Sequence, residues 1–461
     1  MLHARQGERA KRGVSEYLDT ELASYGSYDL VRKLPNFVDG LKMSQRKVVY
    51  TLMKKYPRGE FVKTETLANV TAAFTNYLHG AGNIAGPVCT TMTQGFVGAN
   101  NYPLTRGNSG GFGCRINPNA AAPRYTRVAL SDTARSVFLA EDEEVVGRQY
   151  FEGDLIEPRF FAPVFPVLFL NGASGLSTGF NSAVHPRRPS EVVKYLRARL
   201  AGTEPDCDLR PWFRGFKGEV RPAKGGGWES VGVAERANST RVCITELPIG
   251  TEYAKYIEFL DKLSEENAIS GYEDRCEPKT DTIEFIVRFD RDRLAEMDGA
   301  ALESFLHLRK ALPEILNCID TENRVREFSS AEEVLDAYMA VRMDFYGRRR
   351  EHILARDGER LRVLRSRLSF CEGVVDGSVR VARVPKSEIE AVLDVRDGVE
   401  RVDGSYDYLL KMPVLQLTEE RVAALKDEIA ALEASLAALR DTTPTQMWLS
   451  DLDSWTPPQE S

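Results

Sequence analysis

The sequence predicts an α+β protein of several domains, because three parts of the chain differ in character. Residues 66–131 contain no Asp or Glu but carry four arginines among many Gly and Asn residues. Residues 150–330 alternate strand-like and helical patterns. After Ser330 the pattern is strongly helical and includes a heptad repeat. A chain of 461 residues has room for about two to four such domains.

The formal net charge of −7 conceals an uneven distribution. Residues 1–130 hold 17 Lys and Arg against 8 Asp and Glu, a charge of +9, which leaves −16 for the remainder. A basic segment without carboxylates is typical of a surface that faces a phosphate backbone. We therefore expect the N-terminal part to contact nucleic acid.

The cysteines and the apolar runs indicate the cellular compartment of the protein. Seven widely spaced cysteines without a Cys-x-x-Cys pair predict neither a disulfide framework nor a zinc site. The N-terminus lacks the apolar core of a secretory signal, and no apolar run is long enough to span a membrane. We expect a cytoplasmic protein.

Short helices are expected ahead of the basic segment. A mixed helical pattern runs from Val14 to about Leu34, where Pro35 stops it. A turn then leads into a helix with Arg46 and Lys47 in its first turns, where cations oppose the helix dipole. Either a bound anion offsets this conflict or both side chains are solvated.

Two further helical patterns cover Thr64–Leu78 and Asn83–Met92, and glycine-rich loops fill Gly95–Gly113. Short helices before a basic segment are typical of a helix-turn-helix or winged-helix module. His79 precedes Gly80 at the end of the first pattern. A histidine there is either a helix C-terminal cap or a functional residue.

Tyr125 lies beside a cation, Arg124, within the carboxylate-free segment. A phenol has a reference pKa of about 10, so it attacks only if its anion is stabilised or its proton is removed. A guanidinium also clamps a phosphate in two-pronged geometry and offsets charge on its oxygens. The pair suits attack of a phenol on phosphorus; the ordinary alternative is a tyrosine with a packed ring and its hydroxyl at the surface.

In the middle of the chain, strands are expected at Val164–Leu170, Arg241–Glu246 and Thr282–Phe289. The glycine-punctuated loop Asn171–Gly179 holds a single leucine, Leu176. Such a loop either permits close backbone approach to a ligand or is a structural turn with the leucine in the core. Two acidic triplets, residues 152–154 and 290–292, are interpreted as solvated surface and not as a Mg²⁺ site.

The heptad repeat predicts a paired helix, because its apolar residues recur at alternating steps of three and four. These residues are Val422, Leu425, Ile429, Leu432, Leu436 and Leu439. The repeat is short, and a partial partner pattern lies at Leu354, Leu361, Leu364 and Leu368. An antiparallel pair within one chain is therefore expected, with residues 374–403 as a compact tip that suits a dimer contact.

Short motifs follow one another along the chain. They are Arg32-Lys33-Leu34-Pro35, Asp39-Gly40-Leu41-Lys42, Gln45-Arg46-Lys47-Val48, Phe96-Val97-Gly98-Ala99-Asn100-Asn101, Gly111-Phe112-Gly113, Ala122-Pro123-Arg124-Tyr125, residues 171–179, residues 211–218, residues 244–251 and Tyr408-Leu409-Leu410-Lys411-Met412. In this order they resemble the DNA breakage-and-rejoining region of type IIA DNA topoisomerases. The resemblance covers about Val14 to Leu452.

The resemblance implies a winged-helix (CAP-like) domain that bears the nucleophile, an α/β tower domain, and a long antiparallel coiled coil with a globular dimer-gate tip. The implied boundaries are 1–27 for an N-terminal arm, 28–150 for the winged-helix domain, 151–330 for the tower, 331–445 for the coiled coil with its tip at about 370–410, and 446–461 for a tail.

The resemblance also implies residue roles. Tyr125 would attack a DNA phosphate and form a 5'-phosphotyrosyl link, and Arg124 would stabilise the transition-state charge. His79 and Arg32 would assist at the scissile phosphate. Leu176 stands where the family has an isoleucine that wedges between base pairs. The remaining DNA contacts are expected from Lys42, Arg46, Lys47, Arg115 and Arg127.

Two positions depart from the family pattern, because Leu78 and Ala81 stand where the family often has a histidine and an acidic residue. A contact to metal, water or DNA is expected to be missing there. No metal site and no phosphate-cradling loop are expected on this chain. Mg²⁺ and ATP would be bound by one or more separate ATPase and metal-binding (TOPRIM-type) subunits, as in bacterial enzymes and in phage enzymes that are split further.

The expected function is that of the DNA-cleaving subunit of an ATP-dependent type II topoisomerase, most similar to a split phage-type subunit. Its partners would be double-stranded DNA, a second copy of the chain, and the ATP-binding and metal-binding subunits. One alternative is a catalytically silent DNA-bending scaffold of the same fold. Another is a nuclease that breaks DNA and never reseals it.

Overall fold

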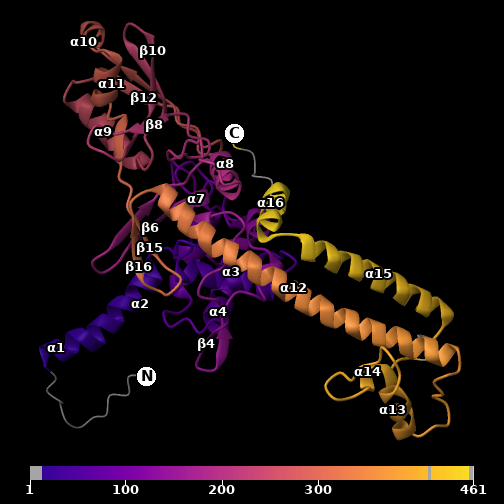
Figure 1. Cartoon of the computed structure of the whole chain (residues 1–461). Coiled ribbons are helices and arrows are strands. Elements are labelled where there is room, and N and C mark those ends of the chain that lie inside the picture. Colours follow the sequence, from indigo (N-terminus) through magenta and orange to yellow (C-terminus); the bar gives the residue numbers. More distant parts are fainter. Residues whose placement is uncertain (1–12, 414–416, 456–459, 461) are drawn as a thin grey trace. The chain divides into compact units, whose positions relative to one another are not determined.

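The computed structural model describes residues 13–413, 417–455 and 460. The chain forms two compact units, one made by Met1–Arg342 with Leu452–Ser461 and the other by Met343–Asp451 (Figure 1). We call them unit 1 and unit 2. Within the described ranges, no helix combines the length and the apolar character needed to cross a membrane.

Unit 1 begins with a continuous helical segment that ends just before Pro35, as predicted. Its parts are α1 (Val14–Tyr17), the π-helical η1 (Leu18–Leu22) and α2 (Ala23–Lys33). The helices that follow are α3 (Met43–Lys55), α4 (Thr64–Phe74), α5 (Gly82–Ile84), η2 (Ala85–Thr90) and η3 (Thr91–Thr93). Helices α3 and α4 pack on each other, and both carry buried apolar residues such as Val48, Leu52 and Leu67.

A small antiparallel sheet completes the N-terminal part of unit 1, in the order β1-β3-β2. Its strands are β1 (Val62–Lys63), β2 (Thr105–Ser109) and β3 (Arg127–Leu130). Short helices with a small antiparallel sheet are the composition of a winged-helix module. The central strand β3 therefore begins two residues after Tyr125.

The next elements lead toward the glycine-punctuated segment. They are α6 (Asp132–Val137), η4 (Ala140–Asp142), β4 (Gln149–Phe151), β5 (Asp154–Ile156), α7 (Val167–Asn171), β6 (Ala173–Leu176) and β7 (Asn181–Val184). The predicted strand at Val164–Leu170 is wrong, because the second half of this run is helix α7, which starts after Pro166. A short buried apolar run fits either structure. The loop predicted at 171–179 is also partly strand, since β6 and β7 form a hairpin.

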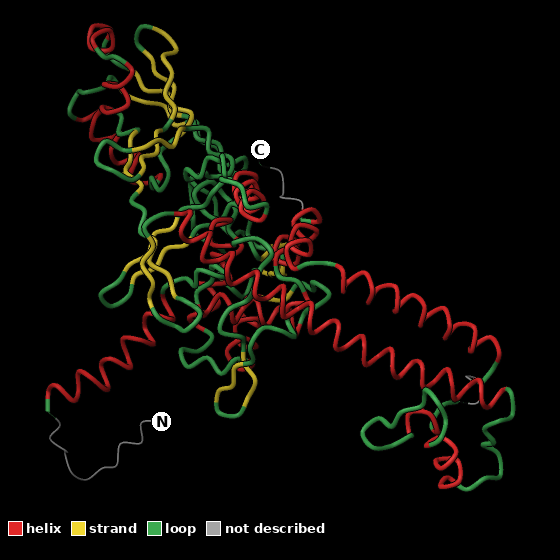
Figure 2. Tube along the Cα trace, in the orientation of Figure 1, coloured by secondary structure: helices red, strands yellow, loops and turns green. Residues whose placement is uncertain are grey.

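The rest of unit 1 is mixed helix and sheet (Figure 2). Its elements are α8 (Pro189–Leu200), β8 (Glu219–Pro222), β9 (Trp228–Val231), β10 (Val233–Asn238), β11 (Arg241–Glu246), α9 (Tyr253–Glu265), β12 (Gly271–Asp274), β13 (Phe285–Arg288), α10 (Arg291–Glu296), α11 (Gly299–Phe305), β14 (Arg309–Leu312), β15 (Leu316–Ile319) and β16 (Val325–Phe328). The strands predicted at 241–246 and 282–289 are confirmed by β11 and β13.

One hydrophobic core holds most of this region together. The four-stranded sheet β10-β11-β13-β12 packs against α9, α10 and α11 through residues such as Val242, Leu260 and Leu302. A second sheet of this region has the strand order β14-β9-β8. Asp290, in one of the acidic triplets, accepts hydrogen bonds from the amides of Asp292 and Arg293 and so caps α10.

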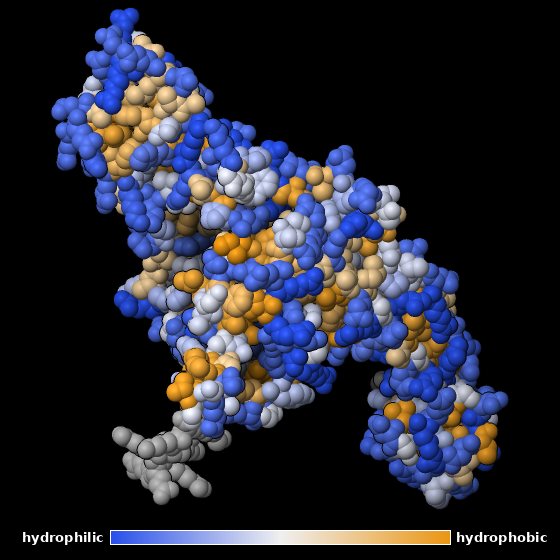
Figure 3. Space-filling view, turned by 60° about the vertical axis from the view of Figure 1, so that its left-hand side comes forward, coloured by the Kyte–Doolittle hydropathy of each residue, from blue (hydrophilic) through white to orange (hydrophobic). Residues whose placement is uncertain are grey.

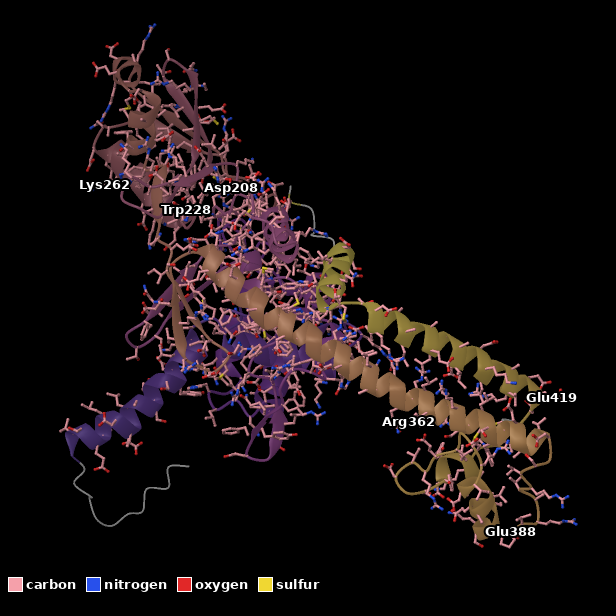
Figure 4. The ribbon with its side chains drawn as sticks, in the orientation of Figure 1. Asp208, Trp228, Lys262, Arg362, Glu388 and Glu419 are labelled. Atoms are coloured by element: carbon pink, nitrogen blue, oxygen red, sulfur yellow. The ribbon has the colours of Figure 1, made fainter. Side chains whose placement is uncertain are left out.

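Unit 2 is built around two long helices that lie side by side in opposite directions (Figure 1). Their full bounds are α12 (Ala331–Val375) and α15 (Glu419–Asp441), and α16 (Pro444–Ser454) follows. Leu361, Leu364, Leu425, Ile429 and Leu436 are buried between them. The predicted antiparallel pair is therefore confirmed. Arg362 on α12 and Glu419 at the start of α15 mark the two helices in Figure 4.

The segment that joins these helices packs into a compact tip, as predicted. It contains α13 (Lys386–Asp394) and α14 (Asp407–Leu410). Phe370, Ile389, Leu393, Tyr406 and Leu409 form its core. Glu388 marks α13 in Figure 4.

Candidate active site and nucleic-acid interface

Tyr125 projects from a turn whose backbone is anchored on both sides. Its amide donates to the carbonyl of Ala122 at 2.8 Å. The next residue, Thr126, is fully buried, and its hydroxyl donates to the Thr64 hydroxyl at 2.7 Å at the start of α4. The Tyr125 side chain is nevertheless 63% exposed. The fold therefore fixes the base of this tyrosine and leaves its ring in solvent.

Arg124 shares the turn with Tyr125. Its guanidinium lies 4.8 Å from the centre of the tyrosine ring, within cation–π range. Gly110 has φ of +74°, and a Cβ there would lie 3.0 Å from the Tyr125 carbonyl, so glycine is needed for the end of β2 to approach. No described residue forms a hydrogen bond with the Tyr125 hydroxyl. The phenol and the cation are thus both available to a phosphate.

Arg124 also lines a hollow of about 250 Å³, together with Glu65, Asn69, Ala81 and Pro123. Ala81 is one of the two positions that depart from the family pattern. Ala81, where the resemblance leads us to expect an acidic side chain, therefore lies in the surroundings of Arg124 and not on a remote surface.

His79 lies in a turn and not at a helix end, because α4 ends at Phe74. The expected alternative of a C-terminal cap is therefore wrong. Its Nε2 is 3.0 Å from the hydroxyl of Tyr28 on α2, and the two rings stack at 5.8 Å. Burial and the nearby Arg32 charge lower the pKa of His79, while Asp29 opposes this effect. The neutral imidazole is favoured.

Arg32 lies at the C-terminal end of α2, next to a buried carboxylate. Asp29 is 1% exposed and accepts from Lys33 Nζ at 3.0 Å and from Arg32 Nη2 at 3.4 Å. Burial raises the pKa of Asp29, but hydrogen bonds from Ser177, Lys33 and Arg32 outweigh it and hold that pKa well below its usual range. The Arg32 Nε is buried and has no partner among the described residues. The Arg32 side chain as a whole is 23% exposed, so part of its guanidinium can reach an anion.

Leu176 ends strand β6 and pairs with Asn181 across the hairpin. The alternative of a core leucine is wrong, because the side chain is 77% exposed. Leu176 lines a cleft of about 730 Å³ together with Arg32, Lys33, Lys42 and His185. Lys42 caps α3, and burial lowers its pKa. The structure thus brings Arg32, Lys42 and Leu176 into one cleft, while Tyr125 lies outside its lining.

Arg46 and Lys47 do not reach the surface, which differs from both alternatives considered for the start of α3. The Arg46 Nε and Nη2 donate to Asp39 at 2.6 and 3.0 Å. The Lys47 Nζ donates to Glu157 at 2.9 Å and to the carbonyl of Thr75 at 2.8 Å. All four charged side chains are at most 6% exposed. Internal carboxylates therefore neutralise these cations, and a direct DNA contact from either one is not supported.

Arg115 is also held within the chain. Its guanidinium forms an ion pair with Glu246, which is 1% exposed and ends strand β11. Its amide donates to Asp281 at 2.8 Å. Arg115 therefore ties the loop before Tyr125 to the four-stranded sheet, and the expected DNA contact is not supported by this arrangement.

Arg127 has the opposite environment. It is exposed at the start of β3 and pairs across the sheet with Lys63 of β1. Like charges directly opposite each other are unfavourable unless an anion lies between them or near them. Arg127 therefore remains a candidate phosphate contact.

The described residues do not fit a resident metal ion. Nowhere in the described ranges do three or more His, Cys, Asp or Glu side chains gather as a metal site. No chemical step is therefore assigned to a metal bound by this chain.

Tyr28 and Asp29 are functional candidates that the sequence did not indicate. Both lie on α2, where Tyr28 contacts His79 and Asp29 accepts from Arg32. The spacing of Asp29 from Arg32 and Lys33 is a usual ion-pair spacing on a helix and could have drawn attention to it. Its contacts with Ser177 and Thr178, by contrast, cross about 150 residues of sequence.

Comparison with known proteins agrees with this geometry. Residues 32–453 match the family model that describes the A subunit of DNA gyrase/topoisomerase IV. Among solved structures, the chain is similar to the topoisomerase II DNA-binding, cleavage and re-ligation domain of Plasmodium falciparum. The TM-score is 0.86 at 27% identity, covering 95% of this chain and 63% of that one.

Curated relatives are much longer proteins. DNA topoisomerase 2 of Penicillium chrysogenum is 29% identical over 478 residues, which cover 96% of this chain and 30% of the relative. The mitochondrial DNA topoisomerase 2 of Dictyostelium discoideum is 27% identical and covers 95% of this chain and 34% of the relative. The chain thus spans about a third of the length of these relatives.

Proposed function

Because the chain belongs to the family of DNA gyrase and topoisomerase IV A subunits, we propose that it is the DNA-cleaving subunit of an ATP-dependent type II DNA topoisomerase. The reaction is a transient double-strand break, passage of a second duplex, and religation. The proposal assigns the break to Tyr125. Two copies of the chain would cut the two strands of one duplex.

The observation that carries the proposal is the exposed phenol of Tyr125 on an anchored turn beside Arg124. A packed structural tyrosine would bury its ring, whereas this ring is mostly in solvent. A fixed backbone also reduces the entropy lost when the hydroxyl meets a phosphate. The turn therefore presents a nucleophile and a cation together.

In the proposed reaction the Tyr125 oxygen attacks phosphorus as the phenol proton is removed. A bond from phosphorus to the tyrosine oxygen forms, and the bond to the 3'-oxygen of the neighbouring nucleotide breaks. That oxygen leaves and takes up a proton, while the 5'-phosphate stays on the enzyme. Religation is the reverse reaction. Arg124 offsets the charge that grows on the phosphate oxygens.

The cleft residues would hold and bend the duplex. The Arg32 guanidinium, whose side chain is 23% exposed, would donate to a phosphate oxygen, and Lys42 adds charge to the same cleft. When the His79 Nε2 accepts from Tyr28, Nδ1 carries the proton and is the donor of the neutral ring. An exposed leucine such as Leu176 has the shape and polarity of a wedge between base pairs.

We further propose that Mg²⁺ and ATP are bound by separate subunits and that the assembly is of the split, phage type. The support is an exposed helical segment, in which Val14, Leu18 and Leu22 are 76%, 46% and 42% exposed. Figure 3 shows that hydrophobic side chains also reach the surface elsewhere in the molecule. Such apolar surface on a solvated helix suits a protein partner. None of the seven cysteines, which all lie within the described ranges, forms a disulfide, and this suits action in a reducing cytoplasm.

The test is a denaturant-trapped adduct assay on the chain purified with its native partners, in Mg²⁺, with a labelled duplex. Wild type is expected to form a covalent protein–DNA adduct, and Tyr125→Phe none, because the ring remains but the nucleophilic oxygen is gone. Tyr150→Phe is the matched control, since Tyr150 is also exposed and should leave the adduct unchanged.

Three outcomes decide between the assignments. An adduct from Tyr125→Phe would show that another residue is the nucleophile. DNA bending without an adduct in wild type would favour the silent scaffold. Loss of the adduct on chelation or heating, with restored DNA, would exclude a nuclease that never reseals.

A further inference from the structure

Helix α2 and the β6–β7 hairpin meet at one buried carboxylate. The Asp29 side chain accepts from the Ser177 hydroxyl at 2.7 Å and from the Thr178 hydroxyl at 3.4 Å. It also accepts from Lys33 and Arg32 on its own helix. Ser177 and Thr178 directly follow Leu176. One carboxylate therefore joins the exposed leucine to the arginine of the cleft.

The hairpin also touches the helix through its backbone. A Cβ at Gly175 would lie 2.4 Å from the Lys33 carbonyl, so only glycine lets β6 approach this closely. The amide of Ser177 donates to the carbonyl of Phe180 at 2.9 Å, which closes the turn beyond Leu176. The tip of the hairpin is thus seated on the last turn of α2, and Asp29 is its side-chain attachment.

A wedge needs such support. Separating stacked base pairs costs free energy, so the duplex pushes back on a leucine that is inserted between them. A two-stranded hairpin is marginally stable alone. Here strand β7 is held by backbone hydrogen bonds between Ala183 and Ile315, and Asp29 holds the turn that follows Leu176. Hydrogen bonds to an ionised carboxylate are about twice as strong as neutral ones, and this carboxylate is shielded from water.

We propose that Asp29 is a positioning residue that holds Leu176 at a fixed offset from Arg32. The distance between the inserted leucine and the phosphate bound by Arg32 is then the same each time the duplex binds. The inference rests on the proposed function, because it assumes that Leu176 enters DNA. Asp29 itself does not touch the substrate.

The test measures DNA bending by energy transfer between dyes at the two ends of a duplex, with 2-aminopurine reporting unstacking at the bent step. The chain is used with the polypeptides that co-purify with it, at saturating DNA. Ser177→Thr and Ser177→Val have the same shape and differ only in the hydroxyl. Asp29→Asn keeps the size but loses the charge, and Asp298→Asn, at the helix cap of α11, is the matched control.

The bent population is expected to fall about tenfold in Ser177→Val and Asp29→Asn, and to stay near wild type in Ser177→Thr and Asp298→Asn. Duplex affinity and melting temperature should stay near wild type in both Ser177 variants. A merely structural role would lower the melting temperature together with the bend. If Leu176→Ala abolishes the bend but Ser177→Val keeps it, the positioning role is overturned. If Leu176→Ala itself bends DNA as wild type does, the wedge role in the proposed function fails first.

Discussion

At the residue scale, the surroundings of α2 determine the protonation of His79. Burial removes water from the imidazole, and the Arg32 charge disfavours a second positive charge, so the pKa lies below its ordinary value. The unfolded chain binds this proton at the ordinary pKa. Stability from the neutral ring is therefore fully present above about pH 6.5 and is lost as the pH falls toward the native pKa.

We predict that a side-chain NMR titration, assigned with His79→Gln, will place the His79 midpoint below that of an exposed histidine. Arg32→Gln should raise the midpoint, because it removes a like charge. Asp29→Asn should lower it, because it removes an attractive one. A wild-type midpoint above about 6.5 would show that the charged ring is favoured instead.

The buried pair on α3 gives a second residue-scale prediction. Burial lowers the pKa of Lys47 and raises that of Glu157, and their mutual attraction opposes both effects. Lys47→Met leaves an uncompensated buried carboxylate and should cost about 3–5 kcal/mol of stability. Thermal unfolding followed by circular dichroism measures this as a lower melting temperature.

Lys54 on the same helix provides the control. It pairs with Glu143, and both side chains are about a third exposed or more. Lys54→Met should therefore cost less than about 1 kcal/mol. The double variant Lys47→Met with Glu157→Gln should recover part of the loss, and equal effects of Lys47→Met and Lys54→Met would contradict the argument.

At the element scale, the paired helices of unit 2 depend on their apolar seam more than on their charges. Leu425 is fully buried against α12, so Leu425→Ala should destabilise the pair by about 2–5 kcal/mol. Arg360 on α12 pairs with Glu428 at 2.7 Å but is 59% exposed, so Arg360→Ala should cost less than about 1 kcal/mol. Hydrogen exchange of peptides from α15 distinguishes the two, and equal loss of protection would contradict this ranking.

Elements with a clear period were predictable and short apolar runs were not. The heptad from Val422 to Leu439 lies within α15, because a 3.5-residue period has one structural solution. Val164–Leu170 has no period, and tertiary packing made its second half helical. The hairpin that carries Leu176 was missed because glycines at 172, 175 and 179 also suit a loop.

The candidate site was predictable where a residue works with its sequence neighbours. Arg124 and Tyr125 are adjacent, so their chemistry is legible in the chain. Arg115 and Glu246 are 131 residues apart, and Lys47 and Glu157 are 110 apart. Neither pair leaves a local pattern. The number of basic residues in the sequence therefore overestimates the number of cations that face solvent.

At the scale of the whole molecule, the tip of unit 2 exposes apolar side chains. Val395 is 85% exposed directly after α13, and Val392 on that helix is 38% exposed. A second copy of the chain would cover such a surface. We predict that Val395→Glu will weaken self-association at least about tenfold, because it places a charge in an apolar contact.

Sedimentation equilibrium measures this effect. Leu155→Glu is the control, since Leu155 is 42% exposed in the β4–β5 hairpin, which belongs to unit 1 and not to the tip of unit 2. It should leave the association constant unchanged. An unaltered dimer in Val395→Glu would place the self-contact elsewhere on the chain.

The internal neutralisation of Arg46, Lys47 and Arg115 has a thermodynamic consequence for a duplex ligand. Each phosphate that a protein cation neutralises releases condensed counterions, and the affinity then falls with salt by a slope of about 0.9 per phosphate. Cations already paired with Asp39, Glu157 and Glu246 release none. If the chain binds DNA as proposed, we therefore expect its affinity to be less sensitive to ionic strength than the basic composition suggests, with a larger share from shape and wedge contacts.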